Sequence, residues 1–575
     1  MTRSPRRHPF ASVLSFGGCG AAALGFALLA QAPSTSVAAQ GPAPATAATP
    51  ASCDDLLLPP REVKGRKVGP SSCLMQAADI QHEGVAYKRV DIGLDGSVDG
   101  YAAKVGDYKD YFTNGPDLVF PQTWGPRQVL SGVAKYERAK GASMTIVYPA
   151  DAARWNGRIF VTVHGRGRSF KEGNLKPWDQ NFNASSPVGD LDRYERLMVA
   201  KGYAVVKTNR TASEGLGEIT ATLEDGSTVD SIAFNDTARY IMDFTDVARA
   251  LVVKRLGRAP VHTYMYGHSA GARIGHSLNY TPGLNVGRDG KRFFDGLLLD
   301  DPAAGTWYPV VMKDGKDVLL TTAQDKATFV PQIDVAHQMY NNIWPPQHPD
   351  WMSSSYLENK RNNARILHDK GIGNYRLYEV RGTSHSGGES MPDSMQRGDL
   401  QNIDVSKVMD RFIDILDAWV DKGAIPPPTH SDDPSLGGTD RPALALPEIA
   451  CPLGVYYNYP ETLSGATAFA AFTGKGIEPL NAKNVWVDMN RNGVWDYRET
   501  PTDAWRRMGL LQRTETLTHE KYVACVQSSA DALRKEGFFS DKAVESYVSR
   551  AKTADLMAKD SAKDTGVRKG LTSDR

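Results

Sequence analysis

A serine between two glycines is the first feature of this 575-residue chain that could carry out chemistry. The sequence Gly267-His268-Ser269-Ala270-Gly271 follows an alternating apolar run and precedes a segment with helical spacing. A sharp strand-to-helix turn lifts a serine hydroxyl clear of a sheet, and glycines on either side relieve the crowding. The start of the helix also offers backbone N–H groups to a developing oxyanion. The pattern predicts that Ser269 is a nucleophile and that the Ala270 N–H stabilises an oxyanion.

A serine hydroxyl is a poor nucleophile unless a base lies beside it, and His385 is the predicted base. It follows the strand-like run 375–382 and stands among small residues in the sequence TSHSGG. His276 and His337 lie in segments with helical spacing, which favours a packing or surface role. His268 is a poorer candidate, because it is adjacent to the serine in sequence and its own backbone sets its direction.

An acid must orient the histidine and stabilise its protonated form. Asp325 is the predicted acid because it ends the strand-like run 317–325 and precedes the sequence KATFVP. The alternatives are Asp300 and Asp301, which end the preceding apolar run, and Asp334. A turn or a helix cap would also explain the Asp300-Asp301 pair.

A second oxyanion donor is predicted in the sequence HGRG, which ends an early strand-like run. Its small, bent backbone suits an N–H from Gly165 or Arg166, beside that of Ala270. Arg166 and Arg168 would also suit a substrate carboxylate. Structural ion pairs explain the two arginines equally well.

The elements that must position these residues alternate between strand-like and helical segments. This alternation predicts a mostly parallel sheet that helices cover on both faces. The helical segments are 194–202 and 236–257, and the strand-like segments are 157–165, 203–209, 261–267, 294–301, 317–325 and 375–382.

Changes in composition define the predicted domain organisation. In order, we expect a signal peptide, a linker, an N-terminal extension with the first strands, the catalytic core, a loop, a C-terminal segment and a disordered tail. Two adjacent prolines and two tryptophans near 338–365 indicate a small lid within the core. The seven ranges are 1–39, 40–52, 53–143, 144–424, 425–442, 443–557 and 558–575.

The first forty residues favour export to the periplasm or the cell exterior. Arg3, Arg6 and Arg7 precede an apolar stretch rich in small residues, and SVAAQ suits a signal peptidase. A retained membrane anchor is the alternative, and the arginine pair indicates twin-arginine export only weakly. The formal net charge of +1 gives no indication of nucleic acid or an anionic membrane surface as a partner.

Four cysteines remain once the signal peptide is removed: Cys53, Cys73, Cys451 and Cys525. An even number in an exported chain favours disulfides over metal ligands. Four cysteines allow three pairings, of which we favour the nearest-neighbour one, Cys53–Cys73 with Cys451–Cys525. Reduced, buried thiols are the alternative.

The segment DMNRNGVWDYRE, residues 488–499, matches the pattern of an EF-hand calcium loop. Gly493 stands where such a loop turns sharply, and the strand-like KNVWV before it favours an isolated loop. Its distance in sequence from Ser269 favours a structural ion, whereas an Asn/Gly turn with solvated acids is the alternative. The predicted ligands are Asp488, Asn490, Asn492, the Val494 carbonyl, Asp496 and Glu499.

Together these residues resemble the α/β-hydrolase family over roughly 144–416. The resemblance is carried by 267–271, the HGRG turn, QDKATFVP and His385, and the chain is similar to exported bacterial serine esterases. ALPEIACPLGVYY resembles the C-terminal extension of that branch, whereas Arg166 departs from the HGGG form of the oxyanion turn. The resemblance implies a doubly wound, mostly parallel sheet with a small lid, N- and C-terminal extensions and no cofactor for catalysis.

The sequence therefore predicts an exported serine esterase that acts on a small or oligomeric carboxylic ester. A serine peptidase or amidase would use the same chemistry, but no propeller-like repeat or other peptide-selecting domain stands out in the sequence. A catalytically silent hydrolase scaffold used for binding is a third class. Neither nucleic acid nor a stable membrane anchor is expected.

Overall fold

The structure is a computed structural model, and it describes most of the chain between residues 51 and 554. The described residues are 51–63, 66–95, 142–163, 191, 193–208, 217–222, 228–233, 235–268, 270–280, 283–302, 310–313, 316–319, 328–337, 354–383, 403–453, 502, 505–506 and 508–554. No helix within these ranges is long and apolar enough to span a bilayer.

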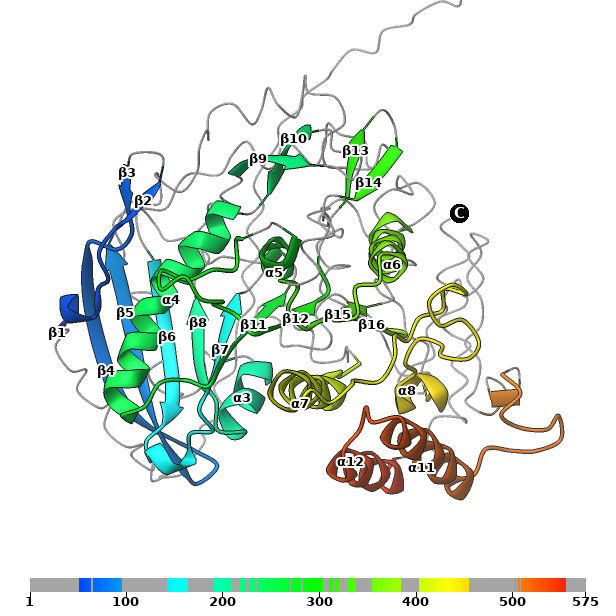
Figure 1. The fold of residues 1–575 in the computed structure, drawn as a ribbon. Helices are drawn as coiled ribbons and strands as arrows, with labels where there is room; N and C mark the ends of the chain where they lie inside the picture. The colour runs from blue at the N-terminus through cyan, green and yellow to red at the C-terminus, as the bar shows by residue number, and fades with distance from the viewer. Residues whose placement is uncertain are drawn as a thin grey trace, which may run out of the picture. The chain divides into compact units, whose positions relative to one another are not determined.

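Ten strands form the central sheet (Figure 1). They are β1 (Ala51–Ser52), β4 (Ser72–His82), β5 (Val85–Asp95), β6 (Ala142–Pro149), β7 (Arg158–Val163), β8 (Ala204–Thr208), β11 (His262–His268), β12 (Gly296–Asp300), β15 (Gln332–His337) and β16 (Tyr375–Val380). Their order across the sheet is β1-β4-β5-β6-β8-β7-β11-β12-β15-β16.

The sheet has an antiparallel side and a parallel side. The pairs from β1 through β8 are antiparallel, whereas those from β8 through β16 are parallel. Every residue of β12 and β15 is buried, as expected for parallel strands covered on both faces. The predicted α/β architecture with a mostly parallel sheet is confirmed.

Helices cover both faces of this sheet (Figure 1). On one face lie α4 (Asn235–Leu256), α5 (Ala270–Tyr280) and α6 (Ser354–Asp369), and on the other lie α3 (Arg193–Ala200) and α7 (Ser406–Lys422). The apolar residues of α4 and α5 share one core cluster with the sheet, and those of α3 and α7 share another. The α7 helix ends at Lys422, and the next residue, Gly423, has a φ of 64° that suits a glycine C-cap.

Smaller elements lie outside the central sheet. They are the hairpins β2 (Arg61–Val63) with β3 (Arg66–Val68), β9 (Gly217–Thr222) with β10 (Thr228–Ala233) and β13 (Val310–Lys313) with β14 (Lys316–Leu319), and the short 3₁₀ helices η1 (Asp54–Leu56) and η3 (Ala152–Arg154).

The predicted sheet strand at 317–325 is wrong. Its first residues form β14, which pairs only with β13 in a separate hairpin. The strand between β12 and β16 is instead β15, so the prediction of helical structure around His337 is also wrong. Two buried polar residues, Gln332 and Asp334, interrupt the apolar pattern of β15. They can be buried because both find hydrogen-bond partners inside the core.

The predicted lid at 338–365 overlaps a helix of the core. From Ser354 onwards the chain forms α6, which packs against β16. Leu357 and Leu367 of α6 are buried in a cluster with Tyr375 and Leu377 of β16. The first part of the predicted lid, 338–353, lies outside the described residues.

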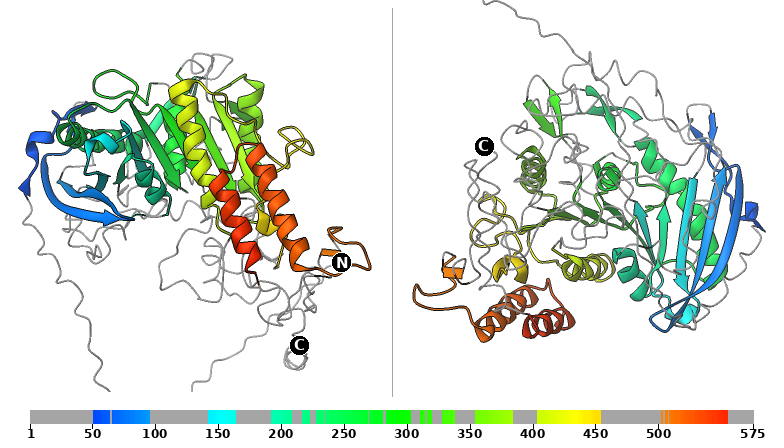
Figure 2. Two further views of the ribbon diagram at one scale, coloured as in Figure 1. Left: turned by 90° about the horizontal axis from the view of Figure 1, so that it is seen from below. Right: turned by 180° about the vertical axis from the view of Figure 1, so that it is seen from behind.

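The C-terminal helices share the core of the sheet. They are α8 (Pro447–Ala450), α11 (His519–Lys535) and α12 (Asp541–Lys552), and Figure 2 shows α11 and α12 beside each other near α7. The Phe538 ring, between α11 and α12, lies 5.1 Å from the ring of Tyr378 in β16 and 6.2 Å from that of Phe412 in α7. The end of the chain therefore stabilises the same core that the sheet builds.

Two disulfides confirm the nearest-neighbour pairing. Cys53–Cys73 joins the residue before η1 to β4. Cys451–Cys525 joins the residue after α8 to α11, across 74 residues of sequence. The second bridge fastens the C-terminal helices to the core segment that precedes them.

Replacing the fully buried Phe538 with alanine should destabilise the whole domain. Loss of a buried phenylalanine typically costs about 3–5 kcal/mol, and urea unfolding should remain a single transition at a lower midpoint. Ile425→Ala is the control, because Ile425 is 85% exposed. If Phe538→Ala instead produced a separate early transition and left the main midpoint unchanged, the shared core would be contradicted.

Candidate active site

The junction between β11 and α5 has the geometry predicted around the serine. β11 ends at His268 and α5 begins at Ala270, so a single position separates strand from helix. Ser269 itself lies outside the described residues. The predicted strand-to-helix context is confirmed, and the role of Ser269 stays a prediction.

Close packing explains the two glycines of this junction. A Cβ on Gly267 would lie 2.7 Å from the carbonyl group of Gly271. A Cβ on Gly271 would lie 2.0 Å from the Val163 carbonyl oxygen at the end of β7. Neither position has room for a side chain, so the start of α5 packs directly on the backbone of the neighbouring strand.

Two buried aspartates lie at the end of the next strand. Asp300 ends β12 and lies opposite His268 in the parallel register. Its Oδ2 accepts a hydrogen bond of 2.9 Å from the Tyr266 hydroxyl, and its Oδ1 lies 2.8 Å from Nε2 of His337. The carboxyl edge of the sheet therefore holds a buried acid–histidine pair beside the strand that leads to Ser269.

Asp301, the second aspartate, holds a strained backbone position. Its φ is 44°, which residues other than glycine rarely adopt. Its N–H donates to the Val335 carbonyl over 2.8 Å, and its carboxylate forms an ion pair with Lys360 of α6. Both charged side chains are almost fully buried. These contacts hold the end of β12 in a fixed conformation.

Hydrogen bonds at both ring nitrogens assign two protons to His337. Thr383 donates its hydroxyl to the Val380 carbonyl over 2.8 Å, so its oxygen accepts from Nδ1 of His337 over 2.9 Å. The Asp300 carboxylate accepts from Nε2. Burial alone would lower the pKa of His337, but the charge and hydrogen bond of Asp300 outweigh it and raise the pKa.

The same pair sets the ionisation of Asp300. Burial would raise the pKa of this carboxyl, but the charge and hydrogen bond of His337 hold it below its ordinary value. With Asp301 and Lys360, the group contains two anions and two cations. Their charges compensate one another inside the protein, as buried charges require.

A third buried aspartate, Asp334 in β15, lies in a separate network. His276 of α5 and the Tyr375 hydroxyl each contact its Oδ2 at 3.0 Å. The side chain of Gln332 donates to its Oδ1 over 2.8 Å. His276 is fully buried, in agreement with its predicted packing role.

The alternative acids therefore all have other partners. Asp300 is bonded to His337 and Tyr266, Asp301 to Lys360, and Asp334 to His276 and its neighbours. His337 has no ring nitrogen left to take a proton from a serine. Sequence analysis missed this acid–histidine–threonine network, although two adjacent aspartates at the end of an apolar run were a signal for it.

The strand order also removes the argument that supported Asp325. Asp325 was predicted to follow the strand before β16, but that strand is β15, and Asp325 precedes it in the sequence. Its role stays a prediction without that support. Thr383, at the end of the described segment after β16, lies two residues before His385.

Most of the predicted site residues lie outside the described part of the chain. Of the oxyanion donors, only Ala270 is described, as the first residue of α5. Within the described ranges, no group of three or more His, Cys, Asp or Glu side chains could hold a metal ion. The predicted residues outside those ranges are Ser269, His385, Asp325, Gly165, Arg166, Arg168, Asp488, Asn490, Asn492, Val494, Asp496 and Glu499.

The fold and this junction define an α/β hydrolase. A family model described as an alpha/beta hydrolase domain matches residues 151–549, so the chain belongs to this family. The match extends well beyond the predicted 144–416 and includes α11 and most of α12, in agreement with their place in the core. No curated protein matches the sequence.

Several solved structures match parts of this chain at low similarity. A carboxyl esterase from the fungus Tuber melanosporum is 13% identical, with 42% of this chain and 71% of that chain covered and a TM-score of 0.24. A poly(3-hydroxybutyrate) depolymerase from Bordetella parapertussis is 15% identical, with coverage of 51% and 87% and a TM-score of 0.27. A poly(aspartic acid) hydrolase from Sphingomonas sp. KT-1 is also 15% identical, with coverage of 42% and 87% and a TM-score of 0.27.

Gly271→Ala should disrupt the junction, because its methyl group would overlap the Val163 carbonyl. Overpacking of this kind typically costs about 1–3 kcal/mol or more, and the displaced turn should lose most hydrolase activity. The measurements are melting temperature and activity on a p-nitrophenyl ester. Gly373→Ala is the control, since no atom of the described residues lies within 4 Å of a Cβ there. Wild-type behaviour of Gly271→Ala would contradict the packing described.

His337→Gln should destabilise the protein in a pH-dependent way. The folded-state pKa of His337 lies above its ordinary 6.5, so its contribution is fully present below pH 6.5 and disappears as pH rises through the folded value. The Asp300 contribution is present above its ordinary 3.8 and is lost on acidification. Breaking the buried pair should cost about 3–5 kcal/mol in the window between these values.

Urea unfolding of His337→Gln and the wild type between about pH 5 and pH 9 measures this effect. The difference between them should shrink towards alkaline pH. His368→Gln is the control, because its side chain is 81% exposed. A difference that does not change with pH would contradict a protonated His337.

Proposed function

We propose that this α/β hydrolase is a serine hydrolase that cleaves carboxylic esters. The observation that carries the proposal is the junction of β11 and α5, where two glycines without room for a Cβ enclose position 269. In the α/β-hydrolase family, the nucleophile stands on a strand-to-helix turn of this kind, at the carboxyl ends of the parallel strands. The chemistry therefore centres on Ser269.

In the proposed reaction, Ser269 attacks the ester carbonyl while His385 takes the hydroxyl proton. The tetrahedral intermediate collapses, and His385 donates that proton to the departing alcohol. Water, activated by the same histidine, then hydrolyses the acyl-enzyme and releases the acid. We assign Asp325 as the acid that orients His385.

Backbone donors are proposed to stabilise the oxyanion. The Ala270 N–H stands at the first position of α5, where helix N–H groups lack partners within the helix. The contact between Gly271 and the Val163 carbonyl supports a second donor, because it brings the end of β7 against the start of α5. Gly165 and Arg166 follow Val163 in the chain, and Arg168 is the proposed contact for a substrate carboxylate.

We further propose that the protein is exported and needs no cofactor for catalysis. The two disulfides support export, because such bonds persist in oxidising compartments. A peptidase or amidase would use the same residues, and a binding protein would keep the fold without turnover. Hydrolysis rates on p-nitrophenyl esters and on peptide anilides separate these three functions.

Ser269→Ala and His385→Ala should each abolish ester hydrolysis and leave the melting temperature close to that of the wild type. Loss of an activated nucleophile or its base costs several orders of magnitude in rate. The control is His368→Ala, which removes an exposed histidine from α6 and should retain activity. Turnover by Ser269→Ala near the wild-type rate would refute the mechanism.

Asp325→Asn should lower kcat without lowering the melting temperature. Asp334→Asn should lower the melting temperature and leave kcat unchanged, because Asp334 is fully buried and has three hydrogen-bond partners. Steady-state kinetics and thermal unfolding of the two variants measure the contrast. Full activity of Asp325→Asn would move the acid to another residue between Ser269 and His385.

We propose a structural calcium ion at 488–499. Two of its side-chain ligands are neutral asparagines, which should weaken binding towards the range of extracellular modules, about 10⁻⁴–10⁻³ M. Calcium should then raise the melting temperature, and Asp488→Ala should remove the difference without changing ester hydrolysis. Calorimetry that detects no binding at millimolar calcium would reduce the loop to a turn.

A further inference from the structure

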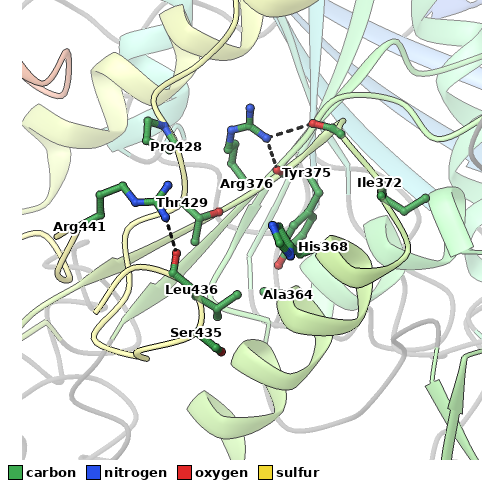
Figure 3. Close-up of a pocket in the computed structure, with 12 residues that line it drawn as sticks. Ala364, His368, Ile372, Tyr375, Arg376, Pro428, Thr429, Ser435, Leu436 and Arg441 are labelled. Atoms are coloured by element: carbon green, nitrogen blue, oxygen red, sulfur yellow. Dashed lines mark hydrogen bonds between the residues drawn. The ribbon is translucent and has the colours of Figure 1, made fainter. Parts of the chain in front are cut away.

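A cavity of about 400 Å³ (Figure 3) lies at the amino ends of the parallel strands. The proposed nucleophile lies at their carboxyl ends. Its lining includes Tyr375 and Arg376, the first residues of β16. Ser269 follows the last residue of β11. Because the intervening strands are parallel, the cavity lies at their amino ends and is separate from the proposed ester site.

Arg376 provides one cation of this cavity. Its Nη1 donates to the carbonyls of Gly373 and Tyr375 at 3.0 and 2.7 Å, and its Nε donates to that of Pro427 at 3.2 Å. The guanidinium also lies over the Trp419 ring, 5.3 Å from its centroid. Within the described residues, no carboxylate lies close enough to form an ion pair with it. Its Nη2 donors are left without a protein partner there.

Arg441 provides a second cation. Its Nη2 donates to the Leu436 carbonyl over 3.2 Å, and among the described residues it too forms no ion pair. Burial lowers the pKa of Arg376, and the nearby charge of Arg441 lowers it further. Two like charges therefore line the same cavity, and among the described residues carbonyl groups and, for Arg376, the face of the Trp419 ring offset them.

The remaining lining combines the polar side chains of Thr429, Ser435 and His368 with apolar walls. Thr429 accepts a hydrogen bond from the Leu377 N–H over 3.1 Å, which leaves its own hydroxyl proton for another acceptor. Ala364, Ile372, Pro428 and Leu436 supply apolar surface. Asp433, which accepts a hydrogen bond from Ser435 of the lining, is already paired with Arg365.

We propose that this cavity binds a small organic anion whose carboxylate lies between Arg376 and Arg441. Guanidinium groups bind carboxylates through paired N–H donors, and an anion would relieve the repulsion between the two cations. The volume lies within the ordinary range for small-molecule sites, about 300–1,000 Å³. The apolar walls favour a ligand with an apolar body over a bare inorganic ion.

Isothermal calorimetry with benzoate, the neutral amide benzamide and inorganic phosphate tests this proposal. The protein is first treated with a fluorophosphonate, so that binding at an ester site does not contribute. Benzoate should bind saturably and benzamide should not. Phosphate should bind more weakly than benzoate, since it lacks the apolar body.

Arg441→Gln should weaken benzoate binding at least about tenfold, because a charge-assisted interaction is lost. Arg441 is exposed, so the variant should fold normally. Arg376→Lys keeps the charge and should bind benzoate with intermediate affinity. The control is Arg255→Gln, which removes an exposed arginine from α4 and should bind like the wild type.

Absence of saturable benzoate binding, or equal affinity in Arg441→Gln and the wild type, would overturn the proposal. Equal affinities for benzoate and benzamide would also overturn it, because they would show that the carboxylate does not contribute. Binding of phosphate as tight as that of benzoate would refute the apolar part of the site. Ester hydrolysis by unlabelled Arg441→Gln should equal that of the wild type, which separates this test from the test of Ser269.

Discussion

The carbonyl of Val163 at the end of β7 leaves no room for a side chain on Gly271 at the start of α5. This backbone-to-backbone contact fixes the angle at which the chain leaves β11 and enters the helix. Gly267 meets the same constraint from the other side, because a Cβ there would overlap Gly271. The proposed nucleophile lies between these two positions. The proposed chemistry therefore depends on how closely two neighbouring parallel strands and one helix approach.

The carboxyl edge beyond this junction is held together by compensating buried charges. Asp300 with His337, and Asp301 with Lys360, connect β12, β15 and α6 through side chains that are at most 1% exposed. A pair of this kind contributes little compared with a well-packed apolar pair, but breaking it leaves an uncompensated charge. Thr383 joins the network through His337 and lies just before the segment with the proposed base. The network therefore holds together the carboxyl ends of β12, β15 and β16.

Local signals predicted the parts of this structure that depend on neighbouring residues. The glycines around Ser269 indicated a tight turn, and the alternation of segments indicated a doubly wound sheet. The even number of cysteines, together with the predicted signal peptide, indicated disulfides, and the two bonds observed join the nearest neighbours in sequence. Each inference rests on short-range geometry or on simple counting.

The failures concern features that depend on distant partners. β15 was missed because its buried Gln332 and Asp334 are satisfied by side chains from other elements. The C-terminal helices were separated from the core because the contacts of Phe538 with β16 and α7 leave no periodic signal in the sequence. His337 was predicted to lie in a helix from the spacing of its segment, whereas it ends a buried strand and its partner Asp300 lies 37 residues away in sequence. The sequence pattern could not show that a residue is buried against a partner far away in the sequence.

Labelling with a fluorophosphonate, followed by mass spectrometry of the digested protein, tests whether Ser269 is the activated nucleophile. The reagent forms a stable adduct only with a serine that an adjacent base activates. We expect a single adduct on the peptide that contains Ser269, and no adduct in the Gly271→Ala protein. A label on another serine, or no label on folded wild-type protein, would contradict this expectation.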